Sequence, residues 1–263
     1  MSFFKTVSFF FFLLRTSIRA SISVRLAFLL EATLLVFNNF VFLVMWWIFF
    51  RQFQEISGWT MRDMIALNAM GMGGYGLMQV CFGGVRELSR SIVRGDLDLF
   101  MMQPKNLLLH LTGSKSLSKG WGHLLTALIL IVLGGFITPY SLLLILIGIF
   151  SSCLVFASVA IIAYSAAFWF GSIEAVSRNY CNSVYLFALY PSNIYSGALQ
   201  IVLFTLLPAG VIGYMPVELL RGFSWMKLIT LLGSACSFFA LAFLVFYRGL
   251  KRYESGNQFG VRY

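Results

Sequence analysis

The sequence predicts an all-α integral membrane protein that crosses the bilayer six times. Of its 263 residues, 60% are hydrophobic and 11% are charged, and the mean hydropathy is +0.88. A water-soluble domain of this length could not bury that much apolar surface in one core. Apolar runs of about 20 residues recur along the chain, which is the length that a helix needs to cross a hydrocarbon layer roughly 30 Å thick. Because these runs are continuously apolar and lack the alternation of β-barrel strands, we expect helices.

Residues 1–24 are expected to form a helix that lies in the membrane surface. Lys5, Ser8, Arg15 and Arg19 follow one another at steps of three, seven and four residues, with phenylalanine and leucine elsewhere around the helix. That distribution is typical of an interfacial amphipathic helix. No small-x-small cleavage site follows the apolar run, so we interpret the segment as retained rather than as a signal peptide.

Six crossings are expected after this surface helix, within one transmembrane domain that covers residues 1–263. The first crossing ends in the aromatic cluster MWWIFF, whose tryptophans suit the membrane interface. The expected crossings are residues 26–50, 64–85, 121–137 and 140–170, one crossing within 183–216, and residues 228–247.

The segment 183–216 is too long for one straight crossing, and it contains Pro191 and Pro208. Proline interrupts helices, and irregular backbone at membrane depth is tolerated only where protein shields it. We therefore expect a broken passage here, with one full crossing and a short re-entrant helix before the last crossing.

The distribution of basic residues predicts the orientation. Of the 19 lysines and arginines, 15 fall on the side of the two termini, and the other side carries only Arg51, Arg62, Arg221 and Lys227. By the positive-inside rule, both termini and the tail 248–263 are cytoplasmic, in a multi-pass protein of the cytoplasmic (inner) membrane. The net charge of +10 lies at the ends of apolar runs, which favours membrane lipid as a partner and argues against nucleic acid.

A charged stretch interrupts the apolar sequence at SIVRGDLDLFMMQPKN, residues 91–106. It belongs to a predicted cytoplasmic segment, residues 86–119, which we call the coupling region. Arg86, Arg90 and Arg94 recur every four residues, which would place them on one face of a helix that leaves the second crossing. Gly95 can end that helix.

Two acidic residues follow the basic ones. In DLDLFMM, Asp96 and Asp98 alternate with apolar residues, which predicts a short element with one apolar and one acidic side. Pro104 blocks continuation of the helix two residues before Asn106. Five apolar residues in seven is unusual for a solvated loop, so we expect this element to offer one face to a docking protein.

Three polar residues in the first crossing are candidates for a translocation path. Glu31 is ionisable, and an unpaired ionisable group in the hydrocarbon costs about 2.5–3.5 kcal/mol or more. Asn38 and Asn39 follow in the same crossing. The alternative is a structural role for Glu31, either in a pair with Arg25 or in a polar contact near the cytoplasmic interface.

The sequence argues against enzyme chemistry, a cofactor or a metal. The segment GMGGYG, residues 71–76, has the spacing of a dinucleotide-binding loop but lies inside an apolar helix, where Ala69 and Gly73 predict close helix packing instead. No GxxxxGK[ST] loop for ATP occurs, and the two histidines have no Cys, Asp or Glu cluster at ligand spacing. Glu174 and Arg178, one turn apart, are expected to form a surface ion pair.

The coupling region resembles that of a known family. RGDLDLFMMQPKN is similar to the cytoplasmic segment after the second helix of ABC-2 type permeases, in particular the single-domain, six-helix ABC-2 family transporter proteins. The layout is also similar over nearly the full chain, with a surface helix, six crossings, the passage LYPSNIYSG followed by LLPAGVIGYMPVELL, and a basic tail. One departure is Gln103, where many relatives carry arginine.

This resemblance implies the transmembrane half of an ABC exporter. Such a permease pairs with itself or with a sister permease, and with two separate ATP-binding cassette ATPase subunits that hydrolyse ATP. The ATPase-coupling residues would then be Arg86, Arg90, Arg94, Gly95, Asp96, Asp98, Pro104 and Asn106.

Two other classes of function stay open at this point. In an ion-coupled secondary transporter, Glu31 would be the coupling-ion site, and the broken passage around Pro191 and Pro208 would hold the substrate. The two halves of the sequence show no convincing inverted repeat of the kind that such transporters contain. The remaining class is a membrane scaffold or a membrane-bound enzyme without a recognisable motif.

Overall fold

The computed structural model describes residues 3–23, 25–53, 55–56, 58–103, 105–191, 194–195 and 197–254. This part of the chain is all-α, as predicted. The longer helices are α1 (Phe3–Ser23), α2 (Arg25–Gln52), α3 (Met61–Phe82), α7 (Ser118–Leu133), α8 (Pro139–Ser165), α10 (Glu174–Ala188) and α13 (Trp225–Leu250). The shorter ones are the 3₁₀ helix η1 (Gly83–Glu87), α4 (Leu88–Arg94), α5 (Leu97–Met101), α6 (Leu107–Gly113), α9 (Ala167–Phe170), α11 (Ala198–Phe204), the π-helix η3 (Gly210–Tyr214) and α12 (Met215–Arg221).

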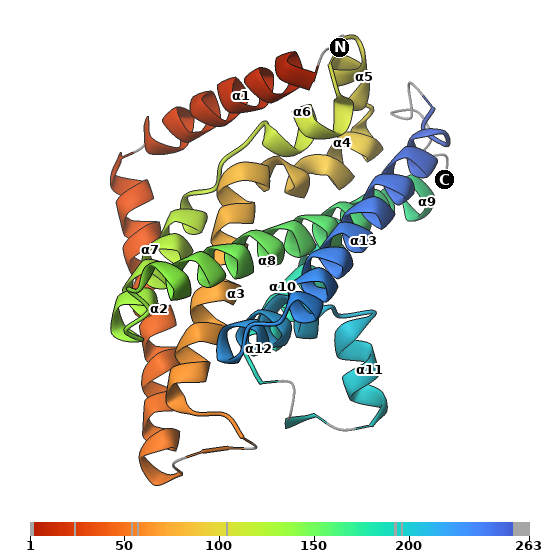
Figure 1. The fold of residues 1–263 in the computed structure, drawn as a ribbon. Coiled ribbons are helices and arrows are strands. Elements are labelled where there is room, and N and C mark those ends of the chain that lie inside the picture. The colour runs from red at the N-terminus through yellow and green to blue at the C-terminus, as the bar shows by residue number, and fades with distance from the viewer. Residues whose placement is uncertain are drawn as a thin grey trace.

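One end of the molecule collects the amphipathic helix and the coupling region. In Figure 1, α1 (red) lies across the same end as α4, α5, α6 and the C-terminal end of α13, and the connection from α2 to α3 lies at the opposite end. We call these the coupling end and the opposite end. The sequence predicts this grouping of the basic segments, and it also predicts that the coupling end faces the cytoplasm.

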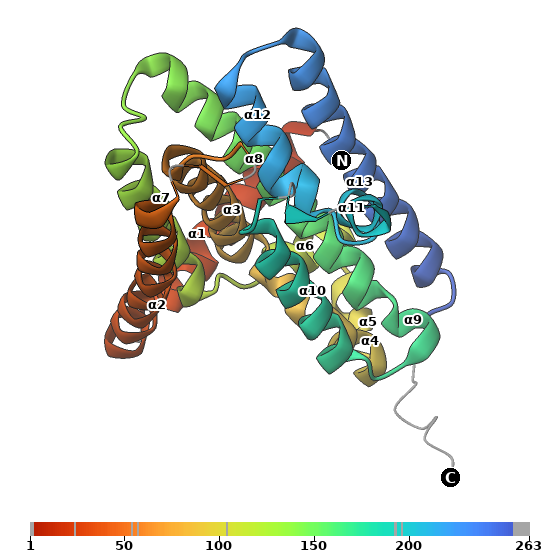
Figure 2. The same cartoon turned by 90° about the horizontal axis from the view of Figure 1, so that it is seen from below.

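Helices α3 and α8 form the centre of the fold. Figure 2 shows α2 and α7 beside α3, and α13 on the other side of α8. In the most apolar stretch of α8 and α9, 67% of the residues are buried by the rest of the protein. The corresponding share is 17% for α2 and 17% for α13. The two flanking helices therefore present apolar faces outward, as contact with lipid or with another membrane chain requires.

Three helices of the described chain are long and apolar enough to cross a membrane. They are α2, the pair α8–α9 (Pro139–Phe170) and α13, and a fourth results if α6 and α7, bent by 77°, form one crossing. The boundaries of α2, α8–α9 and α13 lie within three residues of those expected from the sequence. Helices α3 and α7 occupy the expected second and third crossings, so six crossings stays a prediction.

The passage 183–216 is broken near both prolines. Helix α10 ends before Pro191 and α11 ends before Pro208. After the second proline the chain forms the π-helix η3, in which the Ile212 carbonyl accepts a hydrogen bond of 2.7 Å from Ser152 Oγ of α8. The bond gives the Ile212 carbonyl a hydrogen-bond partner in a segment where the backbone does not follow the regular α-helical pattern. The full crossing and the re-entrant helix in this passage stay predictions.

Glycines let α3 lie directly against its neighbours. A Cβ at Gly73 would come within 2.9 Å of Ile149 on α8, and one at Gly76 would lie 2.7 Å from the Gly120 carbonyl oxygen and 2.9 Å from the His123 Cβ on α7. The segment GMGGYG is therefore a helix-packing surface, as its small residues predict.

Gly76→Ala should lower the stability of the fold by about 1–3 kcal/mol, because the added methyl group forces α3 and α7 apart. Gly233→Ala on α13 is the matched control, since its Cβ meets nothing within 4 Å and alanine is the better helix former. The midpoint of thermal unfolding of the full-length protein in detergent micelles measures both variants. Equal midpoints would contradict the close packing.

Candidate functional site

The coupling region is a chain of short helices with defined ends. Gly95 has φ of +81°, in the left-handed region that favours glycine, and it separates α4 from α5. Asn106 caps α6, because its Oδ1 accepts a 3.0 Å hydrogen bond from the Leu109 amide. Gly95 thus ends α4 as predicted, whereas Pro104 lies outside the described residues.

The three arginines of the coupling region do not share one helix face. Arg86 belongs to η1, and Arg90 and Arg94 belong to α4. A 3₁₀ helix has three residues per turn, so a four-residue step through it no longer returns to the same side. Arg86 is half-buried, and its Nη2 donates a 3.3 Å hydrogen bond to the Tyr75 hydroxyl inside the fold. The predicted continuous basic face is therefore wrong.

Surface ion pairs tie the coupling region to α10. Glu87 pairs with Lys115 at 3.0 Å and with Arg90 at 3.5 Å, and Arg90 also pairs with Glu174 at 3.3 Å. The side chains are between 33% and 55% exposed, so each pair contributes only about 0–1 kcal/mol. The predicted pair of Glu174 with Arg178 is not formed, because Arg90 occupies the carboxylate of Glu174.

Helix α5 exposes apolar side chains rather than an acidic side. Leu97 is fully buried and anchors the helix, whereas Leu99 is 67% and Met102 is 82% exposed, with Met101 beside them. Asp96 and Asp98 are half-buried. The sequence predicts one apolar and one acidic face, but the exposed surface of α5 is apolar, and we call Leu99, Met101 and Met102 the α5 patch.

The C-terminal end of α13 reaches the joint between α4 and α5. A Cβ at Gly95 would lie 3.8 Å from the Tyr253 hydroxyl. Burial, followed by the nearby carboxylates of Asp98 and Asp96, raises the pKa of Tyr253 to about 12. This phenol therefore stays neutral at physiological pH, and it links the last helix to the acidic residues of the coupling region.

Helix α1 packs against the second half of the coupling region, at α6 and Lys105. Ser17 Oγ donates to the carbonyls of Gly113 and Ser114 at the end of α6, at 3.1 and 3.0 Å. The Lys105 ammonium lies 3.8 Å from the centre of the Phe9 ring, a cation–π contact. The helix predicted to lie in the membrane surface therefore packs against α6 and the residues next to it.

The three path candidates on α2 separate into two groups. Glu31 is exposed and accepts a hydrogen bond from Ser118 Oγ at the start of α7, so its partner is not Arg25. Asn38, seven residues later, is also exposed. Asn39 is buried, and its Nδ2 contacts Thr126 Oγ1 at 3.1 Å and His123 Nδ1 at 3.3 Å on α7.

Sequence reasoning missed a buried polar and aromatic cluster around His123. The Tyr185 hydroxyl lies 3.3 Å from His123 Nδ1, and the rings of Tyr75 and Tyr185 stack at 4.3 Å. Together with Asn39 and Arg86, these side chains join α2, α3, α7, α10 and η1. The signal was available, since a histidine and tyrosines inside apolar helices must find polar partners when buried.

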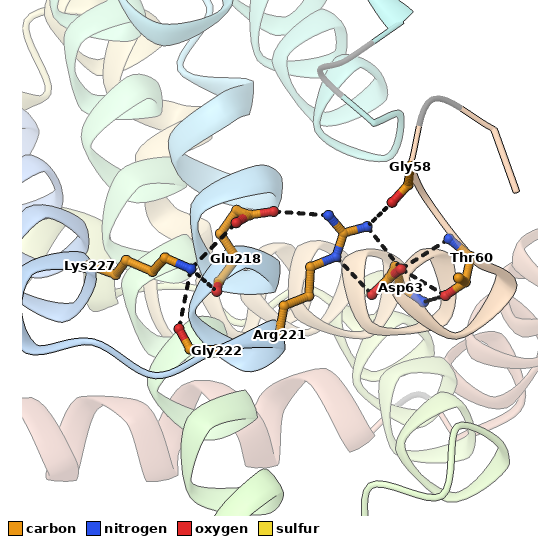
Figure 3. Close-up of polar contacts among 7 residues, drawn as sticks. All are labelled: Gly58, Thr60, Asp63, Glu218, Arg221, Gly222 and Lys227. Carbon is orange, nitrogen blue, oxygen red and sulfur yellow. Dashed lines mark hydrogen bonds and ion pairs between the residues drawn. The ribbon is translucent and has the colours of Figure 1, made fainter.

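A second ionic cluster closes the opposite end (Figure 3). Arg221, at the end of α12, forms a two-bond pair with Asp63 of α3, at 3.0 and 2.9 Å, and donates to Glu218 at 2.9 Å. Its Nη2 also donates to the Gly58 carbonyl at 2.8 Å. Lys227 of α13 donates to the Glu218 carbonyl at 2.9 Å. We call these residues the clamp, and it joins α3, α12 and the start of α13.

The clamp is electrostatically coupled to the start of α3. Thr60 and Asp63 form a capping box, in which each side chain bonds to the other's backbone amide. Burial alone would raise the pKa of Asp63, but hydrogen bonds from Arg221 and Thr60 and the charge of Arg221 outweigh burial, so the pKa is lowered from 3.8. The pKa of Arg221 is raised, chiefly by its hydrogen bond to Asp63. The guanidinium also stacks over Trp59, 4.6 Å from its ring centre.

Within the described ranges, no three His, Cys, Asp or Glu side chains gather closely enough to hold a metal ion. The features that could do mechanical work are the α5 patch with its ion pairs, the buried cluster around His123, and the clamp.

Comparison with known protein families finds one family to which most of this chain is similar. The model of the family described as ABC-2 family transporter protein matches residues 35–257, which include the whole coupling region and the clamp. Searches of curated proteins and of solved structures found no match.

The lowered pKa of Asp63 predicts acid sensitivity. Because its folded-state pKa is below that of the unfolded chain, Asp63 stabilises the fold above about pH 3.8, and this stabilisation is lost as the pH falls below that value. Asp63→Asn should lower stability by about 1–2 kcal/mol at pH 7, and the difference from wild type in thermal midpoint should shrink at pH 3. Glu55→Gln, an exposed carboxylate outside the clamp, is the control. A difference that stays constant between pH 7 and pH 3 would contradict this role.

Proposed function

This chain belongs to the ABC-2 family of transporter proteins, and we propose that it is the permease subunit of an exporter driven by separate ATPase subunits. In this proposal it lies in the cytoplasmic membrane with both termini in the cytoplasm, pairs with a second permease chain, and does no covalent chemistry itself. The observation that carries the proposal is the α5 patch, an apolar surface held out on a short, anchored helix at the coupling end.

The ATPase would dock on the α5 patch. Exposed leucine and methionine side chains on a rigid element suit insertion into a groove of a partner, because methionine adapts its shape to an apolar surface. The buried side chain of Leu97 anchors α5 to the core, and the left-handed backbone of Gly95 sets the angle between α4 and α5. A push on the patch is then transmitted to the fold instead of being absorbed by a loop.

Transmission would follow the contacts of the coupling region. The contact of Tyr253 with the joint between α4 and α5 carries motion to α13, whereas the exposed pair of Arg90 with Glu174 only keeps α10 beside α4. Closure of two ATPases on nucleotide binding would thereby tilt these helices as rigid bodies and open the path alternately to the two sides.

The path itself would run between two permease chains, along one face of α2. Glu31 and Asn38 are seven residues apart, so they lie on the same side of that helix, and both are exposed. A polar amide facing hydrocarbon is costly, which favours a face covered by water or by a second chain. Asn39 belongs to the packing between α2 and α7 instead.

The docking surface can be tested with a paired substitution. Leu99→Glu combined with Met102→Glu should abolish co-purification of the ATPase, because two charges would replace the apolar patch, while insertion and folding stay intact. Met226→Glu is the matched control, since Met226 is 79% exposed but lies at the opposite end of the structure. Normal ATPase association of the double variant at wild-type expression would refute the proposed docking site.

Glu31 separates the proposed exporter from an ion-coupled transporter. In the exporter, Glu31→Gln should retain ATP-driven transport, because glutamine can still accept the hydrogen bond from Ser118. The measurement is uptake into inverted membrane vesicles with ATP, and with a proton or sodium gradient in its place. Transport that follows the gradient and is lost in Glu31→Gln would instead identify a coupling-ion site.

A further inference from the structure

An apolar groove lies between α2, α3 and α7. Its volume is ≈ 400 Å³, within the range of about 300–1,000 Å³ that small-molecule sites occupy. Hydrophobic side chains line it throughout, among them the buried Leu43 and Leu130 and the exposed Val44, Trp47 and Leu133. The groove therefore has an apolar floor and opens to the outside of the molecule, and we call it the α2 groove.

The α2 groove lies on the side of α2 that faces away from the proposed path. Val44 and Trp47 follow Asn38 by six and nine residues, which turns them by about 240° and 180° around the helix. Glu31 and Asn38, along which the proposed function places the second permease chain, thus lie on the far side of α2. Because α2 is apolar and long enough to cross a membrane, a groove left open there is surrounded by lipid chains.

Two arginines flank one end of the groove. Arg51 follows Trp47 by one helical turn, and its guanidinium lies 4.5 Å from the centre of the Trp47 ring. Arg62 directly follows Met61, which also lines the groove at the start of α3. The connection from α2 to α3 lies at the opposite end of the molecule (Figure 1). Both arginines are therefore at helix ends, where residues of a crossing helix meet the lipid head groups.

These two arginines differ from the other basic residues at the opposite end. Among the described residues, neither Arg51 nor Arg62 pairs with a carboxylate, whereas Arg221 and Lys227 both do so in the clamp. Both are exposed, and each guanidinium lies over an aromatic ring, that of Trp47 or that of Phe136. Their N–H groups are thus available to an acceptor outside the protein, and their charges favour an anion.

We propose that the α2 groove binds one anionic phospholipid, with an acyl chain against Leu43 and Leu130 and the phosphate group at Arg51 and Arg62. The apolar lining matches the chain, and guanidinium groups bind phosphate oxygens through charge-assisted hydrogen bonds. Two positive charges favour a head group with net negative charge over a zwitterionic one. The groove and the arginines do not depend on the proposed function, and only the argument that a second chain leaves this side open rests on it.

The head-group contact is tested on the full-length permease without its ATPase, freed of lipid in detergent micelles. Native mass spectrometry measures binding of phosphatidylglycerol and of phosphatidylcholine with identical acyl chains. Wild type should bind phosphatidylglycerol about tenfold more tightly, because hydrogen bonds to charged groups are the strong ones. Arg51→Gln combined with Arg62→Gln should weaken phosphatidylglycerol binding to the level of phosphatidylcholine and leave phosphatidylcholine binding unchanged.

The matched control for this variant is Arg248→Gln combined with Arg252→Gln. It removes two exposed arginines at the coupling end, which do not line the groove, so the preference for phosphatidylglycerol should persist. If wild type binds both lipids equally, or if the control removes the preference as fully, the arginines give only non-specific attraction and the proposal is overturned.

The acyl-chain contact is tested by filling the groove. Val44→Trp should weaken binding of both lipids several-fold, because the larger side chain occupies the space of the chain. Leu34→Trp is the control, since Leu34 is an exposed residue of α2 outside the groove. Unchanged binding of both lipids to Val44→Trp would overturn the proposal, and loss of permease dimers in the same spectra would then identify a second chain as the occupant. No ATPase takes part, so this inference and the proposed docking site fail separately.

Discussion

The fold depends on the close approach of α3 to α7 and α8. Side chains larger than hydrogen at Gly73 and Gly76 would meet α8 and the backbone of α7 at less than 3 Å, so the contact exists only because glycine occupies these positions. Between apolar helices in a membrane, such close packing replaces the hydrophobic effect as the source of cohesion. It also brings Tyr75 of α3 against His123 of α7 and Tyr185 of α10, which creates the buried cluster.

That cluster determines what the arginine at the end of α3 can do. Arg86 belongs to η1, and its side chain lies inside the fold, where the Tyr75 hydroxyl supplies an acceptor at 3.3 Å. A charge in this position is tolerated because it bonds to a hydroxyl and borders a cavity with other polar groups. The turn at η1 sends α4 sideways and points Arg90 to Glu174.

Much of the fold followed from the sequence. The parts that did not follow from it share one cause. The apolar runs predicted α2, α8 and α13 closely, and Gly95 predicted the end of α4, because hydropathy and glycine act locally. The apolar exposed side of α5, the inward turn of Arg86, and the partner of Glu174 depend on which elements meet in space. Glu174 had two arginines available, and only the fold places Arg90 nearer than Arg178. Periodicity assumed one continuous helix through residues 83–94, and two adjacent glycines, Gly83 and Gly84, pack against Lys115 and Leu111 and break it.

The two ends of the molecule differ in a way that suits mechanical coupling. At the coupling end, the ion pairs of Glu87, Arg90 and Glu174 are at least one-third exposed, so water can replace them at little cost. In the clamp, Arg221 and Asp63 are 27% and 18% exposed and share two bonds, so breaking them leaves charges partly buried. Helix α3 begins at the clamp and runs to the coupling end, packed along its length against α7 and α8. In the proposed mechanism, a force applied at α5 would therefore meet weak restraints nearby and strong ones far away, and these helices would pivot about the clamp while their coupling ends move.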